Sequence, residues 1–215
     1  MLIKDNEVAD ISTPTGDMRA HIFRPAAPGK YPGILMFSEI FQVTGPIRRT
    51  AAMLAGHGFI VACPEIYHEL ETPGTVLSYD EEGTTRGNAH KITKELSSYD
   101  TDARAVLDYL KSRDDCTGRL GVMGICIGGH LAFRAAMNPD VLATTCFYAT
   151  DIHKKGLGLG KKLIKRYDLT KPQGVRGRNS DNALLRQVLG WEPEISLEDG
   201  LRLTYFWILE QIRKS

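Results

Sequence analysis

The sequence predicts an α/β fold in which a mostly parallel sheet carries helices on both faces. Short apolar runs of strand length alternate with longer segments of helical spacing, which is typical of parallel strands joined by helices. Several of these runs are apolar throughout, which indicates strands buried on both faces. The length of 215 residues allows one good-sized domain, or one domain with an appendage.

The expected elements follow one another along the chain. Two strands come first, joined by the turn residues Thr15, Gly16 and Asp17. The expected strands are residues 8–12, 18–23, 33–37, 59–63, 119–125 and 142–148, and the expected helices are residues 46–57, 88–113 and 127–137. Pro46 in the first turn and Gly58 just after the end support the first of these helices.

Composition and charge argue against several classes of protein. A net charge of +1 gives no overall attraction to nucleic acid, membrane surfaces or acidic partners. No apolar run approaches the roughly 20 residues of a membrane-spanning helix, and the N-terminus shows no secretory signal. The four cysteines are scattered, with no Cys-x-x-Cys pair, so we expect reduced thiols and a cytoplasmic location. No metal site and no cofactor are expected.

Residues Gly124-Ile125-Cys126-Ile127-Gly128-Gly129 form a Gly-x-Cys-x-Gly-Gly motif at an expected junction of strand and helix. A nucleophile that projects from so tight a turn needs glycine two positions before and after it. The following helix directs its N-terminal amides and its dipole at the sulfur, which stabilises negative charge there. We predict Cys126 as a nucleophile and the amide of Ile127 as an oxyanion donor. The alternative is a buried structural cysteine.

With this motif, residues 1–160 resemble the dienelactone hydrolase family, which has the α/β-hydrolase fold and a cysteine nucleophile. The resemblance includes Ser38-Glu39-Ile40-Phe41, Cys63-Pro64-Glu65-Ile66-Tyr67 and Pro73-Gly74-Thr75. It implies that Glu39 interacts with the resting cysteine, that the Ile40 amide completes the oxyanion hole, and that Arg86 helps to recognise a substrate carboxylate. Independently, a carboxylate at an apolar strand end is costly unless it is paired or functional. The alternative for Glu39 is a solvent-facing loop residue.

Two members of the catalytic triad of this family have no counterpart in the sequence. The family's acid and histidine follow its seventh and eighth strands, and neither motif occurs here. The histidines are His21, His57, His68, His90, His130 and His153. We expect His130 to pack away from the elbow, and we favour neither His153 as a substitute base nor Asp151 as a substitute acid. The resemblance therefore implies a truncated α/β-hydrolase fold with impaired turnover.

The end of the chain has a different character. Capping residues Ser180 and Ser196 predict two helices there. Residues 174–182, 189–193 and 197–201 resemble the C-terminal end of GDP-mannose 3,5-epimerase, an extended short-chain dehydrogenase/reductase. This resemblance implies that Arg178 is a vestigial nucleotide-sugar contact. No dinucleotide fingerprint opens the chain, and the spacing of Tyr167 and Lys171 is interpreted as coincidence.

The expected organisation is a hydrolase-like domain over residues 1–156, a junction over residues 157–162 and a helical segment over residues 163–215. We expect the outer edge of the sixth strand to be exposed, since the family fold has a seventh strand beside it. The leading hypothesis is a hydrolase of small lactones or esters. The alternatives are a non-catalytic fusion protein that binds a small carboxylate, and a fragment of a nucleotide-sugar epimerase.

Overall fold

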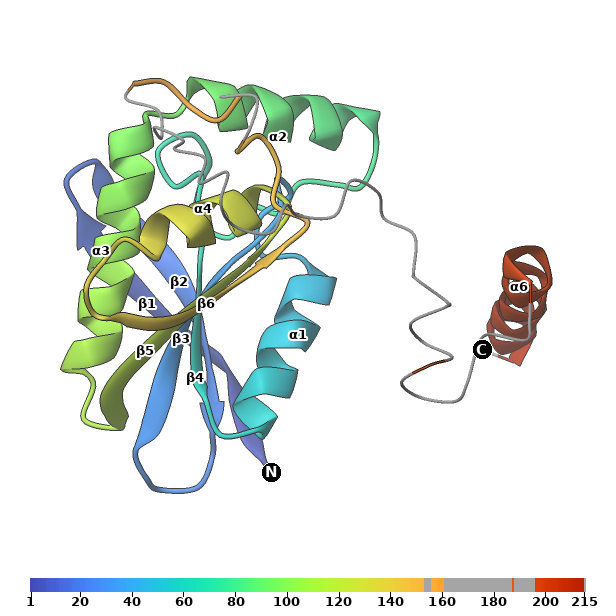
Figure 1. Cartoon of the computed structure of the whole chain (residues 1–215), viewed down its shortest axis with the longest axis horizontal. Helices are drawn as coiled ribbons and strands as arrows, with labels where there is room; N and C mark the ends of the chain where they lie inside the picture. The colour runs from blue at the N-terminus through green and yellow to red at the C-terminus, as the bar shows by residue number, and fades with distance from the viewer. Residues whose placement is uncertain (153–155, 161–186, 188–195, 215) are drawn as a thin grey trace. The chain divides into compact units, whose positions relative to one another are not determined.

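The computed structural model describes residues 1–152, 156–160, 187 and 196–214. The chain divides into two compact units, Met1–Lys165 and Arg166–Ser215. The first contains a sheet with its helices (Figure 1), and the second contains α6 (Leu197–Lys214), which was one of the two helices expected there. None of the described helices is long and apolar enough to cross a membrane.

The described part of the first unit is organised around one sheet with the strand order β1-β2-β4-β3-β5-β6. The strands are β1 (Ile3–Thr13), β2 (Gly16–Pro25), β3 (Tyr31–Phe37), β4 (Ile60–Pro64), β5 (Cys116–Ile125) and β6 (Val141–Phe147). β1 and β2 form a hairpin and β2 is antiparallel to β4, whereas β4, β3, β5 and β6 run parallel. Each expected strand is present, and the first is longer than its apolar core because it pairs along the hairpin.

Helices cover both faces of the sheet (Figure 1). α1 (Gly45–Gly56) packs on one face, and α3 (Leu96–Ser112) and α4 (Ile127–Ala135) pack on the other. The side chains of β4 show the two layers, because successive residues of a strand point to opposite faces. Ile60 and Ala62 join the core beneath α3 and α4, while Val61 and Cys63 join the core beneath α1. β4 is buried along its whole length, as its apolar sequence predicts.

The prediction of a single helix over residues 88–113 is wrong. The structure has α2 (Glu81–Thr93) and then α3, separated by Lys94 and Glu95 in extended conformation. The buried ammonium of Lys94 donates to Asp102 at 2.7 Å and to the carbonyl oxygen of Ile66 at 3.0 Å. Lysine and glutamate favour a continuous helix, but these buried contacts hold a corner at this point.

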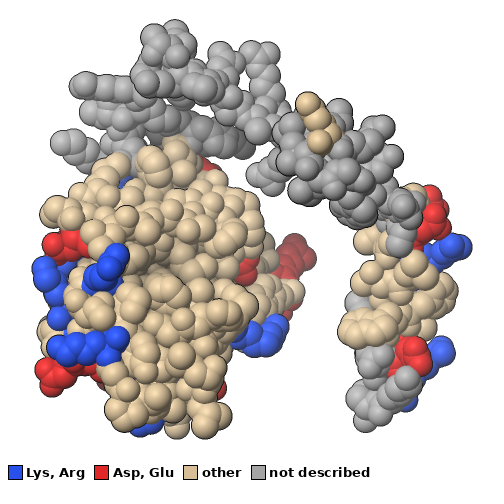
Figure 2. Space-filling view, turned by 60° about the horizontal axis from the view of Figure 1, so that its bottom comes forward, with Lys and Arg blue, Asp and Glu red and all other residues tan. Residues whose placement is uncertain are grey.

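Charged side chains of both signs are interspersed on the face of the first unit seen in Figure 2. Basic and acidic residues share one border of that face, and a broad uncharged area lies beside them. Ion pairs between half-buried arginines and exposed aspartates, such as Arg19–Asp10 and Arg104–Asp108, also occur in the described part of the first unit. No single sign of charge dominates the visible face, in line with the net charge of +1.

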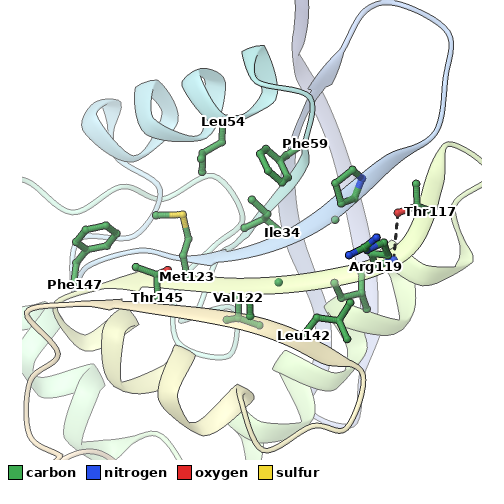
Figure 3. Close-up of a pocket in the computed structure, with 15 residues that line it drawn as sticks. Ile34, Leu54, Phe59, Thr117, Arg119, Val122, Met123, Leu142, Thr145 and Phe147 are labelled. Atoms are coloured by element: carbon green, nitrogen blue, oxygen red, sulfur yellow. Dashed lines mark hydrogen bonds between the residues drawn. The ribbon is translucent and has the colours of Figure 1, made fainter.

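The sheet is less well covered at β6. Among the described residues β6 pairs only with β5, so its outer edge is unpaired, as expected. Leu142 on this strand is 65% exposed. Beside it, a hollow of about 700 Å³ lies between the end of α1 and the sheet (Figure 3). Leu54 and Phe59 line one side of the hollow, and Met123 and Phe147 line the other.

Candidate active site at the nucleophile elbow

Cys126 occupies the tight turn between β5 and α4 with φ 60° and ψ −118°. This backbone conformation is strained for a residue with a side chain, and such strain is common at catalytic sites. The neighbouring glycines are required by space. A Cβ on Gly124 would overlap the carbonyl oxygen of Gly128, and a Cβ on Gly128 would lie 2.6 Å from the carbonyl oxygen of Phe37. The structure therefore contains the steric crowding that was expected to require glycine at these two positions.

Two backbone amides suited to an oxyanion hole lie on adjoining segments. Ile127 is the first residue of α4, where amides have no intrahelical partner. The close approach of Gly128 to the carbonyls of Phe37 and Ser38 brings the loop after β3 against the elbow. Ile40 lies in that loop, and its amide donates no hydrogen bond to the described residues. Both amides can therefore serve a carbonyl oxygen held over the sulfur.

The half-buried carboxylate of Glu39 is held by two tyrosine hydroxyls. Tyr148, directly after β6, donates to Oε1 at 3.0 Å, and Tyr79 donates to Oε2 at 3.3 Å. Burial, together with the hydrogen bond and charge of Glu39, raises the pKa of Tyr148 to about 12, so its hydroxyl remains a donor at neutral pH. Among the described residues no hydrogen bond joins Glu39 to Cys126.

Arg86 lies on α2 and is paired with a carboxylate of the protein itself. Its Nε and Nη2 donate to the two oxygens of Glu71 at 2.7 and 2.6 Å. The Glu71 side chain is only 2% exposed, whereas that of Arg86 is 51% exposed. A buried carboxylate requires such a partner. Arg86 could therefore bind a substrate carboxylate only by sharing or exchanging Glu71.

His90, which no sequence motif marked as functional, shares the same carboxylate. His90 lies one turn after Arg86 on α2, and its Nε2 is 2.5 Å from Oε1 of Glu71. A carboxylate only accepts hydrogen bonds, so Nε2 carries the proton and Nδ1 is an acceptor in the neutral ring. The i, i+4 spacing of Arg86 and His90 was visible in the sequence, but Glu71, which gives the pair its chemistry, is remote from both.

Tyr67, in the loop after β4, connects this group with the elbow. Its ring contacts the ring of His90 edge-on, with centroids 5.2 Å apart, and its hydroxyl donates to the carbonyl oxygen of Gly87. The pKa of Tyr67 is raised by burial and then by the neighbouring charge of Cys126. A Cβ on Gly87 would lie 2.6 Å from the carbonyl oxygen of Ile40. α2 therefore packs directly on the expected oxyanion loop.

Two other side chains near the elbow, those of His130 and Asp151, form hydrogen bonds within the protein. His130 is buried, with Nδ1 3.0 Å from the carbonyl oxygen of Thr150, so it is a packing residue as expected. Asp151 accepts a hydrogen bond from Lys91 at 3.0 Å. Burial raises the pKa of Asp151, but the hydrogen bond and charge of Lys91 outweigh burial and lower it. His153 lies outside the described residues, as do Arg178, Tyr167 and Lys171.

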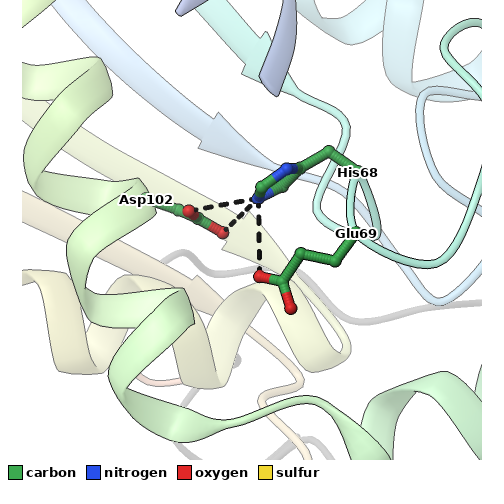
Figure 4. A group of neighbouring side chains, drawn as sticks. All are labelled: His68, Glu69 and Asp102. Atoms are coloured by element: carbon green, nitrogen blue, oxygen red, sulfur yellow. Dashed lines mark hydrogen bonds and ion pairs between the residues drawn. The ribbon is translucent and has the colours of Figure 1, made fainter. Parts of the chain in front are cut away.

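A second cluster of titratable side chains contains His68, Glu69 and Asp102 (Figure 4). Nε2 of His68 is 3.2 Å from each oxygen of Asp102 and 3.7 Å from Oε1 of Glu69. These residue types bind metals, but the ammonium of Lys94 already lies 2.7 Å from Asp102 and 3.1 Å from Glu69. We therefore assign this cluster to the corner between α2 and α3.

A cysteine in a strained turn between a parallel strand and a helix is the arrangement that the α/β-hydrolase fold has at this junction. The chain belongs to the dienelactone hydrolase family, since the model of that family matches residues 18–174. It is 44% identical over 158 residues to a Saccharomyces cerevisiae protein named "Putative carboxymethylenebutenolidase". That match covers 71% of this chain and 58% of the yeast protein, so the chain spans little more than half of its relative.

Solved structures share the fold. The crystal structure titled "Putative Dienelactone Hydrolase" from Klebsiella pneumoniae superposes with a TM-score of 0.59 at 24% identity. The superposition covers 80% of this chain and 66% of that chain. A separate, shorter match is to GDP-mannose 3,5-epimerase of Arabidopsis thaliana, which is 52% identical over 58 residues. It covers 27% of this chain and 15% of the epimerase, so it shows similarity of one segment.

Proposed function

We propose that the first unit is a hydrolase of small lactones or esters in which Cys126 is the nucleophile. The observation that carries the proposal is the elbow, where a strained Cys126 is packed between glycines at the start of α4. Membership of the dienelactone hydrolase family supports the substrate class. The similarity to a protein named as a carboxymethylenebutenolidase supports it further.

The proposed chemistry assigns a role to each expected residue. The sulfur of Cys126 attacks the carbonyl carbon, and the amides of Ile40 and Ile127 stabilise the negative oxygen that forms. The carbon–oxygen bond of the ester or lactone then breaks, and the oxygen leaves with the bonding electron pair and takes up the proton that the thiol has given up. A thioester remains on the cysteine. Glu39 contributes negative charge next to the elbow, and Arg86 contributes positive charge on α2 for a carboxylate-bearing substrate.

We propose that turnover by these 215 residues is slow. A water molecule must be activated to release the acyl group, and this family uses a histidine for that step. The sequence holds no histidine after His153, and it contains neither of the two motifs that carry the acid and the histidine of the family triad. Loss of triad members typically lowers the rate by several orders of magnitude, although an oxyanion hole preserves part of the catalysis.

Intact-mass spectrometry after mixing the protein with p-nitrophenyl acetate tests the proposal. We expect one acetyl adduct that peptide mapping places on Cys126. The Cys126→Ala variant should lose the adduct, and Cys146→Ala, which removes an exposed thiol on β6, should keep it. An adduct that follows Cys146, or no adduct at all, would contradict the proposed nucleophile. Binding of a small carboxylate without any adduct would favour the non-catalytic alternative.

We propose, in addition, that the chain joins segments of two origins. The match of its later residues to GDP-mannose 3,5-epimerase supports this interpretation. Leu157 is buried in the core of the first unit, and Leu159 exchanges backbone hydrogen bonds with Lys94 and Leu96. These contacts favour a boundary after Gly160, later than the expected 156. Since the match covers only 15% of the epimerase, we expect no binding of GDP-mannose, which isothermal titration calorimetry at micromolar concentrations would check.

A further inference from the structure

We propose that His90, oriented by Glu71, is the base that releases the acyl group from Cys126, in a role that rests on the function proposed above. The geometry that points to this role is a histidine–carboxylate pair on α2 with one ring nitrogen left as an acceptor. His90 and Glu71 are separated along the sequence, and the fold brings them to 2.5 Å. No residue of the elbow itself takes part in this pair.

The Glu71 carboxylate fixes the tautomer of His90. It accepts the proton carried by Nε2, so Nδ1 presents a lone pair, as a base requires. Nδ1 receives no hydrogen bond from the described residues, and the side chain is 18% exposed, which gives it access to water. Glu71 is itself held by the two hydrogen bonds from Arg86, so its position is defined independently of His90.

The location of His90 suits a base for the thioester on Cys126. Tyr67 contacts the ring of His90 edge-on, and its hydroxyl donates to the carbonyl oxygen of Gly87. Gly87, three residues before His90, lies against Ile40. The helix that carries His90 is therefore packed on the segment expected to bind the oxyanion. A base can act here through one water molecule, which is the reactant in this step.

The step balances in atoms and electrons. Nδ1 of His90 takes a proton from water while the water oxygen bonds to the thioester carbonyl carbon. The tetrahedral intermediate collapses, the carbon–sulfur bond breaks, and sulfur leaves with the bonding electron pair. The proton on Nδ1 then returns to the sulfur. The products are a carboxylic acid and free Cys126, and the negative charge of Glu71 stabilises the imidazolium in between.

The lifetime of the acetyl adduct on Cys126 tests this inference. After a pulse of p-nitrophenyl acetate and removal of the reagent, intact mass is followed over time in the wild type and in two variants. His90→Gln keeps a donor toward Glu71, and His90→Phe keeps the aromatic contact with Tyr67, but neither can accept a proton. General base catalysis is worth roughly 100-fold or more, so we expect the adduct to persist at least that much longer in both variants.

A matched control is His57→Gln, since His57 is exposed at the end of α1. Among the described residues its ring forms a hydrogen bond only with the Met53 carbonyl oxygen. It should clear the adduct at the wild-type rate. Glu71→Gln should give an intermediate lifetime, because the ring stays but its orientation and charge support are lost. Far-UV circular dichroism and the amount of adduct formed in the pulse establish that each variant is folded and acylated.

The outcomes separate this inference from the proposed function. Equal clearance in wild type, His90→Gln and His90→Phe would overturn the role of His90 while leaving Cys126 as the nucleophile. A wild-type adduct that never clears would overturn it as well. If the wild type forms no adduct on Cys126, the proposed function itself fails, and the role of His90 fails with it.

Discussion

β4 and β6 are both parallel strands with apolar sequences, yet they have opposite environments. β4 lies between β2 and β3 with helices on both faces, and all of its residues are buried. β6 has one described neighbour, and six of its seven residues are exposed. A run such as Ile-Val-Ala-Cys or Val-Leu-Ala-Thr therefore specifies a strand that can be buried on both faces. Whether it is buried depends on the segments that surround it.

The turn that contains Cys126 lies at the boundary between these two regions. Gly124 and Gly128 pack on α4 and on the end of β3, whereas Gly129 lies against the carbonyl oxygen of Phe147 at the end of β6. Tyr148, which holds Glu39, also follows β6. The proposed nucleophile therefore lies in a turn held by close packing of the backbone. The tyrosine that holds Glu39 follows a strand that is mostly exposed.

A large effect on stability is expected to separate two glycines of β5. A Cβ on Gly124 would overlap the backbone of α4, while one on Gly121 would lie 3.5 Å from the Ala143 carbonyl oxygen of β6, an ordinary contact. Overpacking against backbone that cannot move should make Gly124→Ala cost about 3 kcal/mol in the free energy of unfolding. Gly121→Ala should change it by less than about 0.5 kcal/mol. Urea denaturation of both variants measures this, and equal losses would refute a rigid elbow.

A pair of leucine substitutions sharpens the comparison between covered and open strands. Leu35 in β3 is fully buried, whereas Leu142 in β6 is 65% exposed. Leu35→Ala should lower the free energy of unfolding by about 2–5 kcal/mol, because it removes packed atoms and leaves a cavity. Leu142→Ala should change it by less than about 0.5 kcal/mol. A large loss at Leu142 would show that another segment or a second molecule covers β6 in solution.

The stability that the ion pairs around Arg113 contribute should depend on pH. Arg113 bonds to Asp115 at 2.8 Å and to Glu7 of β1 at 2.8 Å. The hydrogen bonds from Arg113 lower the pKa of Asp115. Burial raises the pKa of Glu7, but hydrogen bonds from Arg24 and Arg113 outweigh burial and lower it. The folded state therefore binds these protons less tightly than the unfolded state. The resulting stability is complete above the ordinary pKa values and disappears as the pH falls through the lowered ones.

Arg113→Met removes this linkage. We expect the variant to be less stable than the wild type by about 1 kcal/mol at pH 7, a value reduced by partial solvent screening. The difference should shrink as the pH is lowered from 5 to 3, because the wild type then loses the same interaction. Unfolding curves at several pH values check this. A difference that stays constant down to pH 3 would indicate that Arg113 contributes through packing alone.

The smallest expected effect is a difference in the alkylation of two thiols in the wild-type protein. Cys63 in β4 is buried, and burial raises its pKa to about 12, so it should react with iodoacetamide only after unfolding. Cys146 in β6 is exposed and should be alkylated in the native state, though slowly, since partial burial also raises its pKa. Mass mapping after timed labelling distinguishes them. Protection of Cys146 would mean that β6 is covered.

Much of the fold follows from local patterns in the sequence. The strands and most helices are where the apolar spacing predicts them, and the Gly-x-Cys-x-Gly-Gly motif marks the turn that the structure contains. These features depend on residues that are close along the chain. Their physics is steric and periodic, so it can be evaluated from the sequence one segment at a time.

Only the tertiary structure decided the remaining features. The break between α2 and α3 requires the buried contacts of Lys94 with Ile66 and Asp102, and these outweigh good helix formers. The pairing of Glu71 with His90 joins a loop to a helix, and no spacing rule connects them. Burial of a strand depends on its neighbours, as β4 and β6 show. The sequence by itself determined the strands, most of the helices and the turn from which a nucleophile can project. The packing of distant segments decided where α2 ends and α3 begins and which charges meet, because those interactions exist only after the chain has folded.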